Sequence, residues 1–322
     1  MKPEVHANVP STVAVMIAAY NAETTIARAV RSALAEPEVS EVWVIDDVSS
    51  DDTANVALQA DDGTSRLKVL RQEVNGGPAA ARNRALALCT AKWVCVLDSD
   101  DYFLPGRIGR LLAVSGDVEM IADELIRVTL DEEPEALTPD PQVGALTEID
   151  LASFIAGNIS RRGQYRQELG FIKPLMDRGF LAKNSLAYDT GLRLGEDYHL
   201  YARVLAAGGK LRLAGPLGYV AVTREDSLSG RHSIDDLLAL RNSDRNLMQL
   251  DGLSQEARSA LQRHYLGIDQ RLQWRRLIEA VKSHDVAGAI STLTSAQVAG
   301  YLAVQLAEQG WLRTVGRLRT PS

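Results

Sequence analysis

The stretch KWVCVLDSDD, residues 92–101, indicates how the first third of the chain folds. After Lys92, its first half is uncharged and apolar, as expected of a strand buried inside a parallel sheet. Its second half holds three aspartates, Asp98, Asp100 and Asp101. Acids that directly follow a buried strand are drawn toward one edge of the sheet, so this stretch predicts a strand that ends at a polar site.

The same pattern occurs three times upstream. Three further strands are predicted at residues 12–19, 41–45 and 67–71, separated by helices. Polar residues follow each of these strands: Tyr20-Asn21, Asp46-Asp47 and Asn75-Gly76-Gly77. The alternation predicts an α/β fold with a mostly parallel sheet, and such sheets bind ligands outside the carboxyl ends of their strands.

The composition excludes several functions. The chain has 322 residues, a net charge of -7 and a pI near 5.4, which is the wrong sign for a general nucleic-acid binder. It has 2 cysteines, too few for a disulfide framework, and its start lacks the apolar core of a secretory signal. The longest apolar run, residues 13–20, is far shorter than the roughly 18 residues that cross a bilayer. We therefore expect a cytoplasmic protein.

Two acidic motifs can be interpreted from the residues alone. The step from Asp98 to Asp100 in extended backbone points both carboxylates to one side, which suits Mg²⁺ or Mn²⁺. The alternative is an acidic turn that caps a helix beginning near Pro105. Asp46 and Asp47, at a strand end, can accept hydrogen bonds from a base or a ribose, and the alternative there is capping of the next helix.

Together these motifs resemble those of family 2 glycosyltransferases of the GT-A fold. Four segments carry the resemblance: AAYN at 18–21, IDDVSSD at 45–51, NGGPAAARN at 75–83 and LDSDD at 97–101. The resemblance extends to the group that builds exopolysaccharides of the succinoglycan type. It implies transfer of a sugar, with glucose the first expectation, from a UDP-sugar to a hydroxyl of a glycan or lipid-linked acceptor, with inversion at the anomeric carbon. The Gln-x-x-Arg-Trp motif of processive members is not found, which favours addition of a single sugar.

The resemblance also implies roles for individual residues. Those implied to bind the nucleotide are Ala19, Tyr20, Asp46, Asp47, Arg82 and Asp98. Asp100 is similar to the acid that holds a divalent metal, Mg²⁺ or Mn²⁺, against the diphosphate, where a cation stabilises the charge of the leaving group. Arg231 and His232 are candidates for a loop that closes over the donor, although a solvated loop is the alternative.

The motif Gly195-Glu196-Asp197 precedes an apolar helix. By resemblance, Asp197 is the base that takes the proton of the acceptor hydroxyl, and Glu196 is kept in reserve. Acids in the first turn of a helix are also routine caps, so only the upstream motifs favour catalysis here.

The C-terminal part of the chain is predicted to form a helical extension at 234–322. The preceding catalytic domain, 1–233, is expected to hold a nucleotide-binding half at about 10–115 and an acceptor half at about 150–233, with the acidic stretch 131–150 as a loop or insertion. From Glu256 onward the chain has nine Lys/Arg and five Asp/Glu, a net of +4. Basic amphipathic helices can lie on an anionic membrane surface, and the alternatives are packing on the catalytic domain or dimerisation.

Two other classes of protein stay open at this point. A nucleotidyltransferase shares the sheet and the acidic metal site, but it favours a Gly-rich basic loop after the first strand, where this chain has Tyr20-Asn21-Ala22-Glu23. A non-catalytic nucleotide-sugar-binding protein needs no base, so the joint presence of Asp98, Asp100 and Asp197 argues against it.

Overall fold

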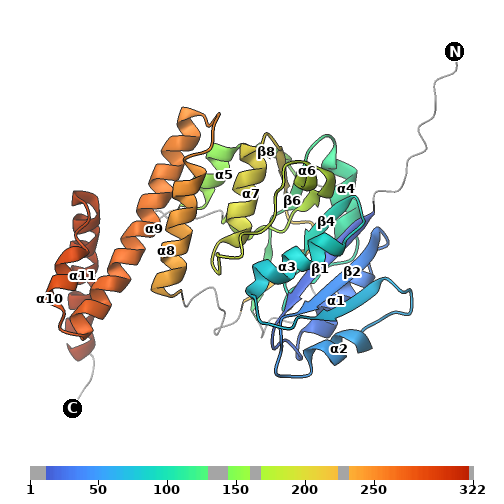
Figure 1. Ribbon diagram of the computed structural model, residues 1–322, viewed down its shortest axis with the longest axis horizontal. Helices are drawn as coiled ribbons and strands as arrows, with labels where there is room; N and C mark the ends of the chain where they lie inside the picture. Colours follow the sequence, from blue (N-terminus) through green and yellow to red (C-terminus); the bar gives the residue numbers. More distant parts are fainter. Residues whose placement is uncertain (1–11, 130–143, 160–167, 224–231, 319–322) are drawn as a thin grey trace. The chain divides into compact units, whose positions relative to one another are not determined.

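The computed structural model of the chain describes residues 12–129, 144–159, 168–223 and 232–318 (Figure 1). The chain divides into two compact units. The first comprises Met1–Phe154 and Glu168–Ser227, and the second comprises Ile155–Gln167 and Leu228–Ser322.

The first unit is built on an eight-stranded sheet of order β3-β2-β1-β4-β9-β6-β10-β8. Its strands are β1 (Val13–Ala19), β2 (Val39–Asp46), β3 (Leu67–Arg71), β4 (Trp93–Val96), β6 (Met120–Asp123), β8 (Thr147–Ile149), β9 (Leu175–Asp177) and β10 (Leu211–Ala214). The first four strands in the chain are parallel to one another, and β6 is parallel to β10. β9 runs antiparallel to β4 and β6, and β8 runs antiparallel to β10. The predicted mostly parallel sheet is confirmed.

A second sheet of three strands lies in the same unit. Its order is β5-β11-β7, formed by β5 (Tyr102–Phe103), β11 (Tyr219–Thr223) and β7 (Ile126–Thr129). The short strand β5 directly follows the acidic stretch after β4, so this small sheet ties the predicted metal-binding loop to a later part of the chain.

Helices pack against the large sheet because its central strands are apolar throughout. The helices of this region are α1 (Ile26–Leu34), α2 (Thr53–Gln59), α3 (Gly77–Leu88), α4 (Arg107–Ser115), α5 (Leu151–Gly157), α6 (Arg178–Lys183) and α7 (Glu196–Ala206). Ile26 and Val30 of α1 join Val13, Val15 and Ile17 of β1 in one apolar cluster. The intervening residues of β1 are buried as well, and α3 contacts this strand. Both faces of β1 are therefore covered, as expected for a parallel strand.

One prediction for this unit needs correction. Part of the stretch 131–150, predicted to be a loop or insertion, forms β8, which pairs with β10 at the edge of the large sheet. β8 has three residues and only Ile149 of them is buried, so it has no apolar alternation that could reveal a strand. Residues 130–143 lie outside the described part of the chain.

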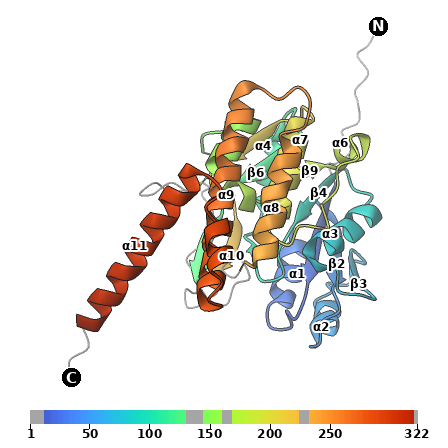
Figure 2. The ribbon, with the colours of Figure 1, turned by 60° about the vertical axis from the view of Figure 1, so that its left-hand side comes forward.

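The second unit contains α8 (Ile234–Leu247), α9 (Gln255–Lys282), α10 (Val286–Ser291) and α11 (Ala296–Leu318), which Figure 2 shows from another side. The predicted helical C-terminal region is confirmed. Ser233 and Asp236 form a capping box that fixes the start of α8. α8 packs on α9, and a buried contact of 2.7 Å joins Asp244 of α8 to His264 of α9. Within the described residues, none of the helices combines the length and apolar character needed to span a bilayer.

Candidate active site at the carboxyl ends of the central strands

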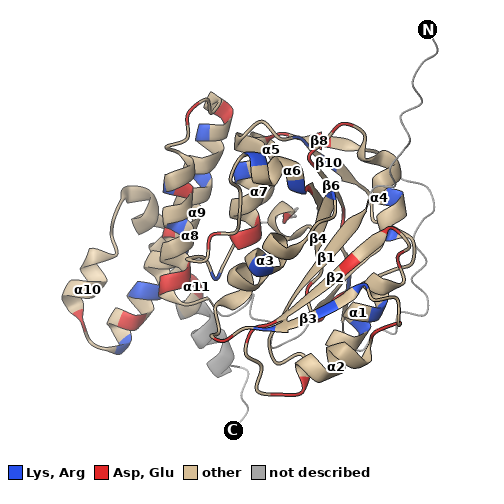
Figure 3. Ribbon diagram, turned by 45° about the vertical axis from the view of Figure 1, so that its right-hand side comes forward, with Lys and Arg blue, Asp and Glu red and all other residues tan. Residues whose placement is uncertain are grey.

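Arg82 on α3 joins acids from distant parts of the chain. Its Nη2 donates to Asp98 Oδ1 at 2.8 Å. Its Nη1 donates to Glu196 Oε1 at 2.7 Å and to Asp197 Oδ1 at 3.1 Å. The acid after β4 and the two acids that begin α7 therefore meet at one guanidinium. Figure 3 marks the basic segment of α3 and the acidic start of α7 on the ribbon.

A second cation, Lys173, contacts the same acids and was not predicted from the sequence. Its Nζ lies 3.0 Å from Asp98 Oδ2 and 2.7 Å from Asp197 Oδ2. Lys173 lies just before β9. It follows the apolar residue Ile172, and Pro174 separates it from Leu175. The sequence does contain one signal that Lys173 belongs to an ion-pair cluster, namely a single lysine in an apolar segment. Such a segment is expected to be buried, and a buried ammonium group needs carboxylate partners.

The electrostatics of this cluster follow from its burial and its mixed charge. The side chains of Arg82 and Lys173 are only 5% and 6% exposed. Burial alone would lower the pKa of Lys173, but the charges of Asp197 and Asp98 raise it. Burial likewise opposes ionisation of Asp98, yet Lys173 and Arg82 lower the pKa of Asp98 to about 2. Two cations and three acids, including Glu196, leave the cluster with one net negative charge.

Two buried tyrosines, Tyr188 and Tyr201, lie near the cluster and help to exclude water from it. Arg82 lies over the ring of Tyr188, 5.5 Å from its centroid. Asn83, the next residue on α3, exchanges two hydrogen bonds of 2.8 Å with the backbone of Tyr188 and so fastens this segment to the helix. Burial raises the pKa values of Tyr188 and Tyr201 well above the ordinary value. The ion pairs of the cluster are therefore weakly screened by water.

The loop after β4 is held by the small sheet. Tyr219 donates its hydroxyl hydrogen to Asp101 Oδ2 at 2.8 Å, and the Val222 backbone N–H donates to Asp101 Oδ1 at 2.9 Å. Burial, together with the neighbouring charges of Asp98 and Asp100, raises the pKa of Asp101 to about 7. Arg28 donates to the backbone carbonyl of Asp100 at 3.0 Å. The backbone of this loop is thus fixed, and its acids repel one another.

The metal prediction has a limited structural basis. Within the described residues, no group of three or more His, Cys, Asp or Glu side chains is arranged to hold a metal ion by itself. Asp100, the predicted metal ligand, lies half-buried in the loop after β4.

The remaining predicted nucleotide-binding residues lie at the ends of the neighbouring strands. Ala19 and Asp46 are paired in the register of β1 and β2, and Tyr20 follows with 53% of its surface exposed. Asp46 is fully buried and lies 3.3 Å from a guanidinium nitrogen of Arg71. β2, β1 and β4 are parallel neighbours, so these residues and Asp98 share one edge of the sheet.

Asp47 has a structural task in addition to its predicted one. Its Oδ1 accepts hydrogen bonds from Gln72 Nε2 at 2.5 Å and from the Gly76 N–H at 2.8 Å, and its Oδ2 accepts from the Gly77 N–H at 2.7 Å. Gly77 has a φ of 78°, which side-chain-bearing residues rarely adopt. Asp47 therefore braces the turn that starts α3, the helix that carries Arg82.

Arg231 and His232 are the two candidates for the loop that closes over the donor. Arg231 lies outside the described residues. His232 precedes the N-cap of α8 in the second unit. Their role stays a prediction.

Comparisons with known proteins agree with this geometry. The family model "Glycosyl transferase family 2" matches residues 14–132. The chain is 48% identical over 276 residues to the succinoglycan biosynthesis protein ExoU of Rhizobium meliloti (strain 1021), covering 84% of this chain and 79% of that protein. It is 37% identical over 97 residues to UDP-Glc:alpha-D-GlcNAc-diphosphoundecaprenol beta-1,3-glucosyltransferase WfgD of Escherichia coli, covering 30% of this chain and 38% of that protein.

The chain therefore belongs to glycosyl transferase family 2 and is a glycosyltransferase. Its fold is similar to that of S. aureus TarS 1-349 in complex with UDP-GlcNAc, with a TM-score of 0.60 and 18% identity over 87% of this chain and 90% of that one. The predicted family and the predicted GT-A fold are confirmed.

Proposed function

We propose that this glycosyltransferase transfers one sugar, with glucose the first expectation, from a UDP-sugar to a hydroxyl of a glycan or lipid-linked acceptor during synthesis of a bacterial exopolysaccharide. The observation that supports the proposal is that Arg82 binds both Asp98, the proposed nucleotide contact, and Asp197, the proposed base. The names of ExoU and WfgD support the pathway and the donor.

In the proposed reaction Asp197 accepts the proton of the acceptor hydroxyl as that oxygen attacks the anomeric carbon. Each carboxylate oxygen has about two lone-pair positions, so one cation on each oxygen still leaves a position for the proton. Attack from the side opposite the nucleotide inverts the anomeric configuration. Glu196, which shares Arg82 Nη1 with Asp197, is the alternative base.

The ends of β1, β2 and β4 would bind the nucleotide. Tyr20 would lie against the base, and the carboxylates of Asp46 and Asp98 would accept hydrogen bonds from the base and the ribose. Asp47 would contribute mainly by holding the turn before α3.

The acidic loop fits a divalent ion that is shared with the donor. Mg²⁺ is commonly held by one or two carboxylates together with substrate phosphates, and Asp100 would be the protein ligand of Mg²⁺ or Mn²⁺. Burial raises the pKa of Asp101, and the neighbouring charges of Asp98 and Asp100 add to this rise, so a cation bound here would offset the repulsion among these acids. When bound, the ion would stabilise the charge that develops on the departing diphosphate.

The test is a panel of UDP-, GDP- and dTDP-sugars, each with Mg²⁺, Mn²⁺ or a chelator, scored by thermal stabilisation and by release of the nucleoside diphosphate. We expect a UDP-sugar with metal to stabilise the protein most. Asp197→Asn should keep this stabilisation and lose turnover, whereas Asp100→Ala should lose its metal-dependent part.

Other outcomes of the panel would favour the two remaining classes. Formation of a nucleotide-sugar from a nucleoside triphosphate and a sugar phosphate would indicate a nucleotidyltransferase. Stabilisation by a UDP-sugar without transfer to any acceptor, in wild type and Asp197→Asn alike, would indicate a binding protein.

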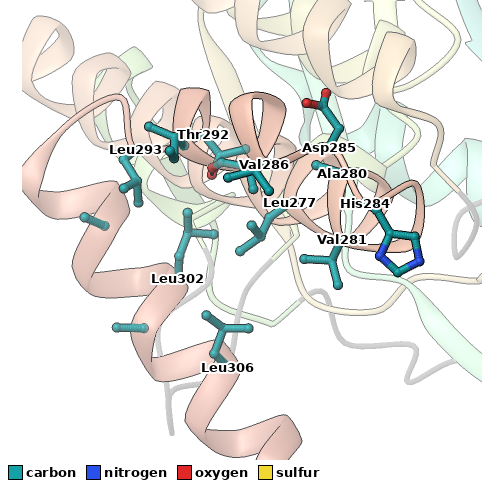
Figure 4. A pocket seen from close by; sticks show the side chains of 14 residues that line it. Leu277, Ala280, Val281, His284, Asp285, Val286, Thr292, Leu293, Leu302 and Leu306 are labelled. Atoms are coloured by element: carbon teal, nitrogen blue, oxygen red, sulfur yellow. Dashed lines mark hydrogen bonds between the residues drawn. The ribbon is translucent and has the colours of Figure 1, made fainter.

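We also propose that residues 1–233 act as the catalytic domain, and that the helical extension 234–322 brings this cytoplasmic enzyme to the anionic inner surface of the membrane. An apolar groove of about 510 Å³ lies between α9, α10 and α11 (Figure 4). Val286 and Ile290 at this groove are 72% and 65% exposed. Residues 256–322 carry a net charge of +4 within a chain of -7, which is the complement of an anionic surface.

Co-sedimentation with vesicles tests the membrane proposal. The wild type should bind vesicles rich in phosphatidylglycerol and should not bind neutral vesicles. The double variant Val286→Glu/Ile290→Glu should bind the anionic vesicles at least about tenfold more weakly. Leu58→Glu, at an exposed apolar residue of the first unit, is the control. Equal partitioning of all variants would reject the proposal, and a loss of dimer in place of lipid binding would assign the groove to a second copy of the chain.

A further inference from the structure

Asp98 and Asp197 are linked through two cations rather than one. Each acid gives one carboxylate oxygen to Arg82 and its other oxygen to Lys173. The four side chains form a closed ring in which two positive charges face two negative charges. Glu196 contacts Arg82 in this ring, whereas Lys173 forms its ion pairs with Asp98 and Asp197.

Lys173 is held from its backbone as well as from its ammonium group. Its carbonyl oxygen accepts a hydrogen bond of 2.7 Å from Arg107 Nη2. Arg107 is itself fully buried and forms a 2.7 Å ion pair with Asp123. The next residues form β9, which lies between β4 and β6 in the large sheet. The backbone of Lys173 is therefore held in place, and its ammonium group can orient the carboxylates of Asp98 and Asp197.

A single cation would leave the carboxylate of Asp98 or of Asp197 free to rotate. A carboxylate bound only by Arg82 through one oxygen can still turn about its Cβ–Cγ bond. A second cation on the other oxygen removes that freedom and fixes the direction of the remaining lone pairs. Orientation of this kind matters because a shift of about 1 Å in a reacting group can cost about 10²-fold in rate.

We propose that Lys173 is a positioning residue for sugar transfer, which fixes the carboxylate of Asp197 relative to Asp98 so that the base faces the acceptor hydroxyl beside the bound donor. The inference rests on the proposed function, since it assigns the base role to Asp197. It also gives a structural reason why Asp197 rather than Glu196 is the base: Lys173 and Arg82 both hold Asp197, whereas Glu196 meets only the Arg82 end of the ring.

The test compares Lys173→Met, which keeps the length and removes the charge, with Lys173→Arg, which keeps the charge. Lys183→Met, at an exposed lysine of the same unit, is the matched control. We expect Lys173→Met to lower kcat about 10²-fold while the KM for the UDP-sugar and the stabilisation by UDP change less than about threefold. Lys173→Arg should recover part of the lost rate, to between about a tenth and about a half of the wild-type kcat, because the guanidinium keeps the charge but differs in shape and reach.

A double variant separates positioning from a general structural effect. If Lys173 acts through Asp197, then Lys173→Met should cause no further loss of residual transfer in an Asp197→Asn background. The proposal is overturned if Lys173→Met leaves kcat unchanged, or if it lowers the rate by the same factor with Asp197 and with Asn at that position.

The outcomes also distinguish this inference from the proposed function. If the wild type transfers sugar from none of the UDP-sugars, the proposed function fails; if the wild type is active and Lys173→Met is equally active, only the inference fails. Should Lys173→Met not fold, Lys173→Arg decides, because positioning requires a lower kcat at unchanged UDP affinity. The inference would be overturned if Lys173→Arg lowered kcat and the affinity for UDP by the same factor, or if it changed neither.

Discussion

The hydroxyl of Tyr219 stands between Asp101 and the backbone of Asp98. It donates to Asp101 Oδ2 at 2.8 Å and accepts from the Asp98 N–H at 3.2 Å. Tyr219 belongs to β11, far along the chain from β4. The small sheet therefore holds the acidic loop through this phenol, together with the Val222 N–H that donates to Asp101 Oδ1.

Tyr219→Phe should loosen that loop. The ring would stay buried against Phe103, but two hydrogen bonds would be lost, one of them to a carboxyl group. We expect the free energy of unfolding, measured in urea, to fall by about 1–3 kcal/mol. We also expect weaker metal-dependent stabilisation by UDP. Unfolding and metal response identical to wild type would show that the loop keeps its shape without the phenol.

Arg82→Lys should impair turnover although it keeps the charge. An ammonium cannot reproduce the planar fork that reaches Asp98 with one nitrogen and Glu196 and Asp197 with the other. We expect kcat to fall about 10²-fold, measured with the donor that the panel identifies. Arg84→Lys, two residues along the same helix and exposed, should retain the wild-type rate.

Asp47→Ala should act on stability and on donor binding together. Three donors would lose their acceptor, among them the N–H groups of Gly76 and Gly77 at the start of α3. We expect a loss of about 2–3 kcal/mol in unfolding free energy, because hydrogen bonds to a charged group are among the stronger ones. Titration calorimetry with UDP measures the effect on donor binding, and we expect a lower affinity for UDP. A stable variant with reduced UDP affinity alone would assign Asp47 a direct contact instead.

Cys89 should be inert in the folded protein. Burial raises the pKa of its thiol to about 12, and burial raises the pKa of Cys95 too. A raised thiol pKa means that the unfolded state ionises first, so the contribution of Cys89 to stability is complete below pH of about 8.5 and is lost as the pH rises toward 12. At pH 8 we expect no reaction of either cysteine with a thiol reagent until denaturant is added. Rapid labelling of the native protein would contradict this expectation.

The sequence predicted the parts of the site that depend on local pattern. Each acid that follows an apolar strand, such as Asp46 or Asp98, could be placed at the edge of the sheet because parallel neighbours end on the same side. Asp197 could be placed only by resemblance, because an acid in the first turn of α7 looks like a helix cap.

The partners of Lys173 and the brace formed by Asp47 could not be predicted, since both depend on which distant segments meet. The position of Lys173 follows from the insertion of antiparallel β9 beside β4, and three residues give no periodicity that reveals this pairing. Asp47 stays a predicted nucleotide contact, and the turn at Gly76 and Gly77 also donates hydrogen bonds to its carboxylate.

The place of β9 has a consequence for how the protein is made. β9 separates β4 from β6 in the sheet, although β6 precedes it in the chain. During synthesis on the ribosome, the two halves of the sheet cannot join until the segment around Leu175–Asp177 has emerged. A nascent chain that ends sooner exposes the backbone groups of two unjoined strand edges, so chaperone binding should persist up to this length and then decline.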